Sequence, residues 1–117
     1  MISDFEKIVL MIDEKNNINL NRIRAYNKWR IAERKKENKS VLKELYQHYK
    51  DKSVEGKELF KEIRLIKKNI GAKFEWNSSG YCVAIKVNDL VIHGREAIVN
   101  AATDIKLDAM LLGKELS

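Results

Sequence analysis

Four cations in the middle of the chain recur at helical intervals, three or four residues apart. They are Lys57, Lys61, Arg64 and Lys68. On a helix this spacing places them about one turn apart on one face, where they could follow a phosphate backbone or an acidic protein surface. With four phosphate contacts, a plot of the logarithm of the binding constant against the logarithm of the salt concentration would have a slope of about −3.6. The alternative is a solvated helix face that Glu58 and Glu62 partly balance.

A second group of cations is interleaved with two aromatic residues. Its members are Arg22, Arg24, Tyr26, Lys28, Trp29, Arg30, Arg34 and Lys35. Such a mixture is typical of proteins that bind single-stranded nucleic acid, because bases stack on the rings while phosphates meet the charges. Packing of Tyr26 and Trp29 in a hydrophobic core is the more usual fate of such rings. A third interpretation is a hot spot for a protein partner, where Tyr, Trp and Arg are enriched.

Positive charge is concentrated in the part of the chain that holds both groups. Residues 20–73 contain 17 Lys and Arg against 7 Asp and Glu, a net charge of +10, whereas residues 1–19 and 74–117 each have a net charge of −2. A localised positive field attracts polyanions, whereas uniform charge mainly aids solubility. We therefore expect the partner to be a nucleic acid, DNA or RNA, or else an acidic or nucleic-acid-binding protein.

Residues that could do other chemistry are few. His48, His93 and the single Cys82 are too few, at unrelated spacings, for a zinc site of the usual kinds. The carboxylates lie mostly beside cations, so no acid–base pair stands out. His93 and Gly94 precede an expected helix, and the exposed amides at a helix start can hold an anion, to which Arg95 would add positive charge. We expect no enzyme activity, no metal and no cofactor.

The sequence also bounds the setting of the protein. No stretch approaches the ~20 apolar residues that a membrane-spanning helix needs. The first residues lack the basic start and apolar run of a secretory signal, and Cys82 has no second cysteine to pair with. These features predict a cytoplasmic protein with no membrane partner.

Apolar periodicity predicts helices over the first 70 residues. Ser3 and Glu6 have the form of a capping box, which opens a helix over about 3–15. Asn16, Asn17 and Asn19 favour turns, so this helix is expected to end there. A second helix follows over 20–37. It has two apolar sides, which predicts that it is sandwiched between neighbours and could support self-association.

The boundaries beyond this second helix are left open by the sequence. Ser40 could cap a third helix over 41–52, but no strong breaker precedes it, so one long helix over about 20–52 is the alternative. That long helix would form half of a helical hairpin. Ser53 could then cap a helix that ends near Asn69, with Gly71 in a left-handed closing position.

After Ala72 the period changes from helical to alternating. Phe74 and Trp76 are followed by a turn over 77–80, an alternating strand over 81–87, a two-residue turn and a returning strand over 90–93. After Gly94 a last helix is expected, with apolar residues at helical spacing from Ile98 to Leu112 and Gly113 to close it, packed on one face of the sheet. The fold class is therefore α+β. The chain is expected to form one domain over 1–117, with a basic helical part (1–70) and a β-β-β-α part (72–117).

The order of helix, three antiparallel strands and helix over residues 54–112 resembles the double-stranded-RNA-binding domain. Tyr81, Val83, Ile85 and Val87 stand where that family has an aromatic residue and alternating apolar residues. The resemblance implies the topology of that fold. The family's basic Lys-Lys-x-Ala-Lys motif at the start of the last helix is replaced here by residues 94–98, with Arg95 as the only cation. The expectation therefore extends to the topology and not to binding of duplex RNA.

These observations predict a small basic nucleic-acid-binding protein with an accessory or regulatory role. The absence of proline, with 17 Lys, 13 Ile and 10 Asn, fits an AT-rich gene and suggests a phage or mobile-element origin. The alternative is a protein-binding inhibitor or adaptor, for example a phage protein that blocks a host defence nuclease by occupying its nucleic-acid cleft. The choice between DNA and RNA, the sequence preference and the oligomeric state stay open.

Overall fold

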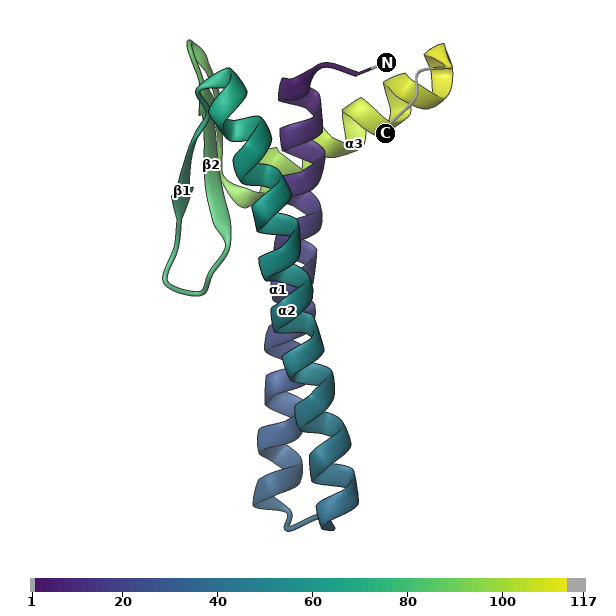
Figure 1. The fold of residues 1–117 in the computed structure, drawn as a ribbon. Helices are drawn as coiled ribbons and strands as arrows, with labels where there is room; N and C mark the ends of the chain where they lie inside the picture. Colours follow the sequence, from purple (N-terminus) through teal and green to yellow (C-terminus); the bar gives the residue numbers. More distant parts are fainter. Residues whose placement is uncertain (1, 114–117) are drawn as a thin grey trace.

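The computed structural model describes residues 2–113 and has the predicted α+β architecture. Two long antiparallel helices form a hairpin, and a three-stranded antiparallel meander and a C-terminal helix gather around the open end of that hairpin (Figure 1). The elongated molecule measures 51 × 30 × 24 Å. Its elements are α1 (Asp4–Arg34), α2 (Lys39–Ile70), β1 (Lys73–Trp76), β2 (Cys82–Val87), β3 (Leu90–His93) and α3 (Arg95–Leu112).

The first helix begins as predicted but does not end where the asparagines suggested. The backbone N–H of Glu6 donates to Ser3 Oγ, and the N–H of Ser3 donates to Glu6 Oε1, which confirms the capping box. The predicted break at Asn16, Asn17 and Asn19 is wrong, because α1 continues to Arg34. Asn16 and Asn19 bond to the strand region instead of to their own backbone, so their tendency to interrupt a helix is not expressed.

The hairpin turns at residues 35–38, which excludes one long helix over 20–52. Lys36 has a φ of 56°, and Asn38 caps the next helix by accepting a hydrogen bond from the N–H of Val41 at 2.9 Å. The cap is therefore Asn38 and not Ser40. The expected helical hairpin is confirmed as a fold, but its arms are α1 and α2 and not a helix over 20–52.

The two helices expected over 41–52 and from Ser53 to Asn69 are one helix, α2. Ser53 does not cap a new helix, because its hydroxyl donates to the carbonyl of Tyr49 one turn earlier, at 3.2 Å. The predicted end of the helix is confirmed, since Gly71 takes the left-handed conformation with φ of 64°.

The main core lies at the open end of the hairpin, where α1 is central. This helix packs against α2, α3 and β2. Side chains from all four elements are fully buried there: Ile8, Val9, Ile12, Ile63, Ile85 and Ile98. Further along the hairpin, Ala25 and Ala32 face α2, whereas Ile31 is exposed. The prediction that residues 20–37 form a sandwiched helix is therefore wrong for the distal part of α1.

The strands confirm the predicted meander. β2 is the central strand; Phe74 of β1 pairs with Ile85, and Leu90 of β3 pairs with Val87 across the turn, in which Asn88 has a positive φ of 53°. The last helix packs on the sheet through buried Ile98 and closes at Gly113, as predicted. Within residues 2–113 no helix is long and apolar enough to cross a membrane.

Asn16 is expected to be essential for stability. Its side chain accepts from the N–H of Cys82 at 2.8 Å and donates to the carbonyl of Cys82 at 3.0 Å, and both bonds are buried. Asn16→Ala leaves these two groups without this partner, so we expect the free energy of unfolding to fall by about 1–3 kcal/mol. Urea unfolding measures the change. The control is the exposed neighbour Asn17→Ala, and equal effects of the two variants would contradict the assignment.

Gly56 is expected to tolerate a side chain. It is buried where α1 and α2 meet, yet a Cβ atom there would lie 3.5 Å from Ile18 Cγ2 and 3.9 Å from Lys15 Nζ, which are ordinary van der Waals distances. Because alanine favours the helix, Gly56→Ala should raise the free energy of unfolding by about 0.5–1 kcal/mol. The measurement is the midpoint of denaturant unfolding, and a lower midpoint would show that the helices cannot accommodate the methyl group.

Candidate anion-binding interface

A groove between α1 and α2 joins cations that the sequence had placed in separate groups. Its volume is about 340 Å³, and Arg22 of α1 and Lys57 of α2 both line it. The complete lining is Lys15, Ile18, Asn19, Arg22, Tyr49, Lys52, Ser53, Gly56 and Lys57. Four of these residues are cations and none is a carboxylate. We call this the cationic groove.

Arg22 is held in the cationic groove by neutral partners. Its Nε and Nη2 donate to Asn19 Oδ1 at 3.2 and 2.9 Å, and Asn19 Nδ2 donates to the carbonyl of Ser79 at 2.9 Å. Gly80 permits this approach, because it has a φ of 86° and a Cβ there would lie 3.0 Å from Asn19 Oδ1. The β1–β2 loop therefore orients Arg22 through an amide, which leaves the positive charge of the guanidinium uncompensated.

Lys15 brings a partly desolvated charge to the same groove. Its Nζ lies 5.3 Å from the ring centroid of Phe60 and 5.5 Å from that of Trp76. Burial lowers the pKa of Lys15, and the nearby charge of Arg22 lowers it further. The ammonium group thus lacks both full hydration and a carboxylate partner within the groove. An anion bound there would supply the missing counter-charge.

The remaining two cations of the groove come from α2. Lys52 pairs with Glu55 at 3.1 Å, outside the groove lining, whereas Lys57 is exposed. Between them Gly56 contributes no side chain.

The predicted stripe on α2 extends from this groove. All four of its members are exposed, as a solvent-facing stripe requires. Lys61 pairs with Glu58 at 3.2 Å, and the guanidinium of Arg64 lies 4.8 Å from the centroid of Phe60. The far end of the stripe reaches a second hollow of about 460 Å³, which again has no carboxylate. It is lined by Arg64, Lys67, Lys68, Gly71, Ala72 and Lys73.

The groove, the stripe and the second hollow form one surface, which we call the basic flank. Lys57 lines the groove, and Lys68, eleven residues later, lines the second hollow. At ~1.5 Å per helical residue they are about 16 Å apart along α2, the length of roughly five nucleotides at ~3.4 Å each. The basic flank therefore has the length to meet several consecutive phosphates.

Tyr26 and Trp29 turn towards α2 in the distal part of the hairpin, where they pack with Tyr46 and Tyr49. The ring centroids of Trp29 and Tyr46 are 4.8 Å apart, and those of Tyr26 and Tyr49 are 5.3 Å apart. This aromatic tip cluster favours the packing interpretation of the two rings. It is not fully covered, since Tyr26 is 39% and Tyr46 40% exposed.

The other predicted cations of α1 are dispersed around the distal hairpin. Arg30 pairs with Glu33 at 2.8 Å and lies 5.8 Å from the ring centroid of Trp29. The remaining four are exposed and line neither the cationic groove nor the second hollow: Arg24, Lys28, Arg34 and Lys35. At the start of α3, Arg95 lies over Tyr81 at 3.5 Å from its centroid, and the N–H of Gly94 bonds to the carbonyl of Val83. Arg95 and the N–H of Gly94 therefore already have partners within the protein.

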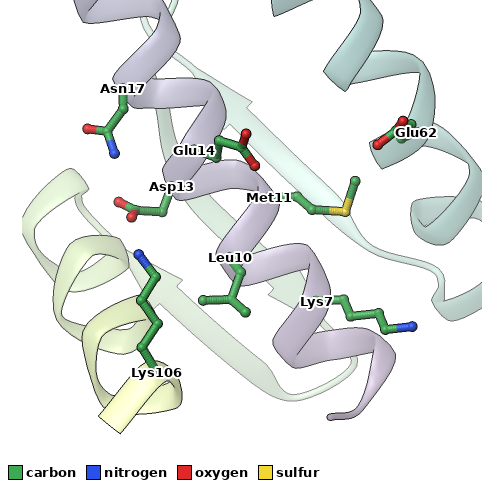
Figure 2. Close-up of a pocket in the computed structure, with 8 residues that line it drawn as sticks. All are labelled: Lys7, Leu10, Met11, Asp13, Glu14, Asn17, Glu62 and Lys106. Carbon is green, nitrogen blue, oxygen red and sulfur yellow. The ribbon is translucent and has the colours of Figure 1, made fainter. Parts of the chain in front are cut away.

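A third hollow has mixed charge and does not extend the basic flank. This trough, of about 620 Å³, runs along α1 between α2 and α3, with Leu10 and Met11 in its floor (Figure 2). Lys7 and Lys106 are present, but so are three carboxylates, Asp13, Glu14 and Glu62. Asp13 and Lys106 point towards each other across it (Figure 2). A polyanion would meet repulsion here.

Sequence reasoning missed Lys15, Lys52 and Trp76 as site residues. Lys15 and Arg22 are seven residues apart, so they share a face if the helix runs through the asparagines between them. Because a helix end was predicted at residues 16–19, Lys15 and Arg22 were assigned to different helices and their shared face was not recognised. Trp76 was recognised only as a strand residue, and its place beside Lys15 depends on how β1 packs against α2.

Comparison with protein-family models, with curated proteins and with solved structures found no match for this chain. Function is therefore inferred from the geometry and charge described above.

Asp13 is expected to lower the stability of the protein at neutral pH. Burial raises the pKa of this carboxyl above its usual 3.8, and the opposing effect of Lys106 is smaller. The folded state thus holds the proton more tightly than the unfolded state, so stability falls as the pH rises through the folded pKa. Asp13→Asn should be more stable than the parent at pH 7, and this advantage should shrink as the pH falls towards 3.8. Urea unfolding over this range measures it, with the exposed Glu14→Gln as control; an advantage that does not change with pH would contradict the assignment.

Proposed function

We propose that this protein binds nucleic acid through the basic flank, as a small accessory or regulatory protein. The observation that carries the proposal is the cationic groove, which four cations from two helices line with no carboxylate in the lining; of the four, Lys52 alone is in an ion pair, with Glu55. The stripe on α2 continues this surface to a second carboxylate-free hollow. A surface of this kind neutralises phosphates and releases their counterions, which supplies much of the affinity in nucleic-acid binding.

The distribution of ion pairs supports this proposal. Within residues 2–113 three ion pairs form, each between residues three apart on one helix. Most cations of residues 20–73 therefore have no carboxylate within 4 Å and could exchange their counterions for phosphates. The trough on the other side of α1 carries both signs of charge, so the attraction is directional.

The aromatic tip cluster favours a second candidate function, docking on an acidic or nucleic-acid-binding protein. Tyr26 and Tyr46 are partly exposed, and Arg30 and Lys50 lie over the rings of Trp29 and Tyr46. Tyr, Trp and Arg carry much of the binding energy in protein interfaces. An inhibitor that occupies another protein's nucleic-acid cleft would use this end of the hairpin. The proposed phage or mobile-element setting stays a prediction from composition alone.

The two functions make different predictions for charge reversal. The double variant Lys61→Glu/Arg64→Glu should weaken binding to labelled nucleic acid and reduce the magnitude of the salt slope on duplex DNA by about 1.8, because two phosphate contacts of the basic flank are lost. Titrations with duplex DNA, single-stranded DNA and duplex RNA between 50 and 200 mM salt, a range over which four contacts would cost roughly a hundredfold in affinity, measure this effect.

The matched variant alters the tip without changing charge. Tyr26→Ala/Tyr46→Ala should leave binding and its salt slope unchanged, and circular dichroism checks that both variants keep their helices. Absence of binding by the parent protein at 50 mM salt would sink the nucleic-acid proposal. Capture of an acidic protein partner that only the tip variant loses would then support the second function.

A further inference from the structure

We infer that the cationic groove and Trp76 together form a site for single-stranded nucleic acid. One phosphate lies among Lys15, Arg22 and Lys57, and a neighbouring base stacks on the indole of Trp76. This inference rests on the proposed function and deepens it, since it names the form of nucleic acid that the basic flank takes.

The groove and the indole are adjacent. Lys15 lines the cationic groove, and its Nζ lies 5.5 Å from the ring centroid of Trp76. A phosphate that meets Lys15 is therefore close to the indole. Successive bases and phosphates alternate along a strand, so a site for one next to a site for the other matches a nucleotide unit.

Trp76 combines a fixed position with exposure. Its ring meets Phe60 at 5.5 Å and 82°, and Phe74 at 6.1 Å and 77°, both in edge-to-face geometry. Trp76 is nevertheless 39% exposed. The two phenylalanine contacts hold the indole in place, so little conformational freedom would be lost when a base stacks on it.

The groove is also organised before any ligand arrives. The chain of hydrogen bonds from Arg22 through Asn19 to Ser79 ties its wall to the β1–β2 loop. Its volume of about 340 Å³ is many times the ~10–15 Å³ that a cavity needs to hold one water molecule. It can therefore take a phosphate group together with some of its hydration water.

The indole distinguishes single strands from duplexes. Cations alone grip the phosphates of both forms and carry little selectivity. In a duplex the bases are stacked on one another and cannot lie on an external ring, whereas an unpaired base can. Exposure of Trp76 beside the cationic groove therefore favours the single-stranded form.

Tryptophan fluorescence tests the inference directly. The chain has two tryptophans, so Trp29→Phe leaves Trp76 as the only reporter. A single-stranded DNA and a single-stranded RNA of about ten nucleotides, and a DNA duplex of the same sequence, are titrated at 50 mM salt. We expect the single strands to quench the emission of Trp76 and the duplex to bind at least about tenfold more weakly without quenching. The two single-strand arms distinguish DNA from RNA.

Binding variants then separate the two halves of the site. Trp76→Leu should weaken single-strand binding by about 5- to 150-fold, as expected for one stacked base, and leave duplex binding unchanged. Lys57→Gln should lower the single-strand salt slope by about 0.7, whereas the matched variant Lys43→Gln, an exposed α2 cation outside the groove, should not. Gly56→Ala adds a methyl group 3.9 Å from Lys15 Nζ and should weaken binding although it stabilises the helix, so unfolding cannot explain its effect.

The outcomes that overturn the inference differ from those that overturn the proposed function. Equal binding of duplex and single strands without quenching of Trp76 overturns the inference and leaves the proposed function standing. Equal effects of Lys57→Gln and Lys43→Gln remove the groove from the site. Failure of the parent protein to bind any of the nucleic acids at 50 mM salt overturns both.

Discussion

The paired hydrogen bonds between the Asn16 side chain and the backbone of Cys82 fix the position of the sheet on the hairpin. The two residues are 66 positions apart, and both bonds are buried. Because a buried amide must be satisfied in both its donor and its acceptor, α1 can meet β2 in one register only. Asn19 then reaches Ser79 one helical turn further on, and Arg22 reaches Asn19 another turn on. The cationic groove thus depends on how α1 packs against the β1–β2 loop.

The sequence predicted the elements well where the signal was local. The capping box at Ser3, the closing Gly71 and the strand over 81–87 are each set by residues within a few positions, and all three are confirmed, the strand as Cys82–Val87. The errors occurred where a distant partner decided the outcome. Asn16 and Asn19 interrupt helices only if they bond locally, and their partners lie some 60 residues away. The true turn at 35–38 contains neither glycine nor proline, and its single asparagine, Asn38, is the residue that caps α2.

The candidate site divides in the same way. The stripe on α2 follows from helical spacing alone, and the structure places its four cations on an exposed surface. The cationic groove depends on how α1 and α2 are aligned along each other, and no local sequence pattern determines that alignment. Lys15 was missed because it precedes the asparagines, and Trp76 because a strand residue gives no sign of which helix lies beside it. From the sequence, Tyr26 and Trp29 could either pack in a core or bind a partner. Their contacts with the rings of Tyr46 and Tyr49 on α2 show that packing accounts for most of their surface.

The protein has two hydrophobic clusters, of which the aromatic tip cluster is the second. One is the aliphatic core around Ile8, Ile12 and Ile63, which three helices and the sheet enclose; the other is the small group of rings further along the hairpin. Only two helices shelter the second cluster, so its backbone hydrogen bonds are the more accessible to water and the cheaper to open. Tyr49 belongs both to this cluster and to the lining of the cationic groove, so opening that stops short of Tyr49 leaves the sheet, the β1–β2 loop and the groove with their geometry. The cost of opening the backbone therefore falls along the same pair of helices, from the sheet end to the turn at 35–38.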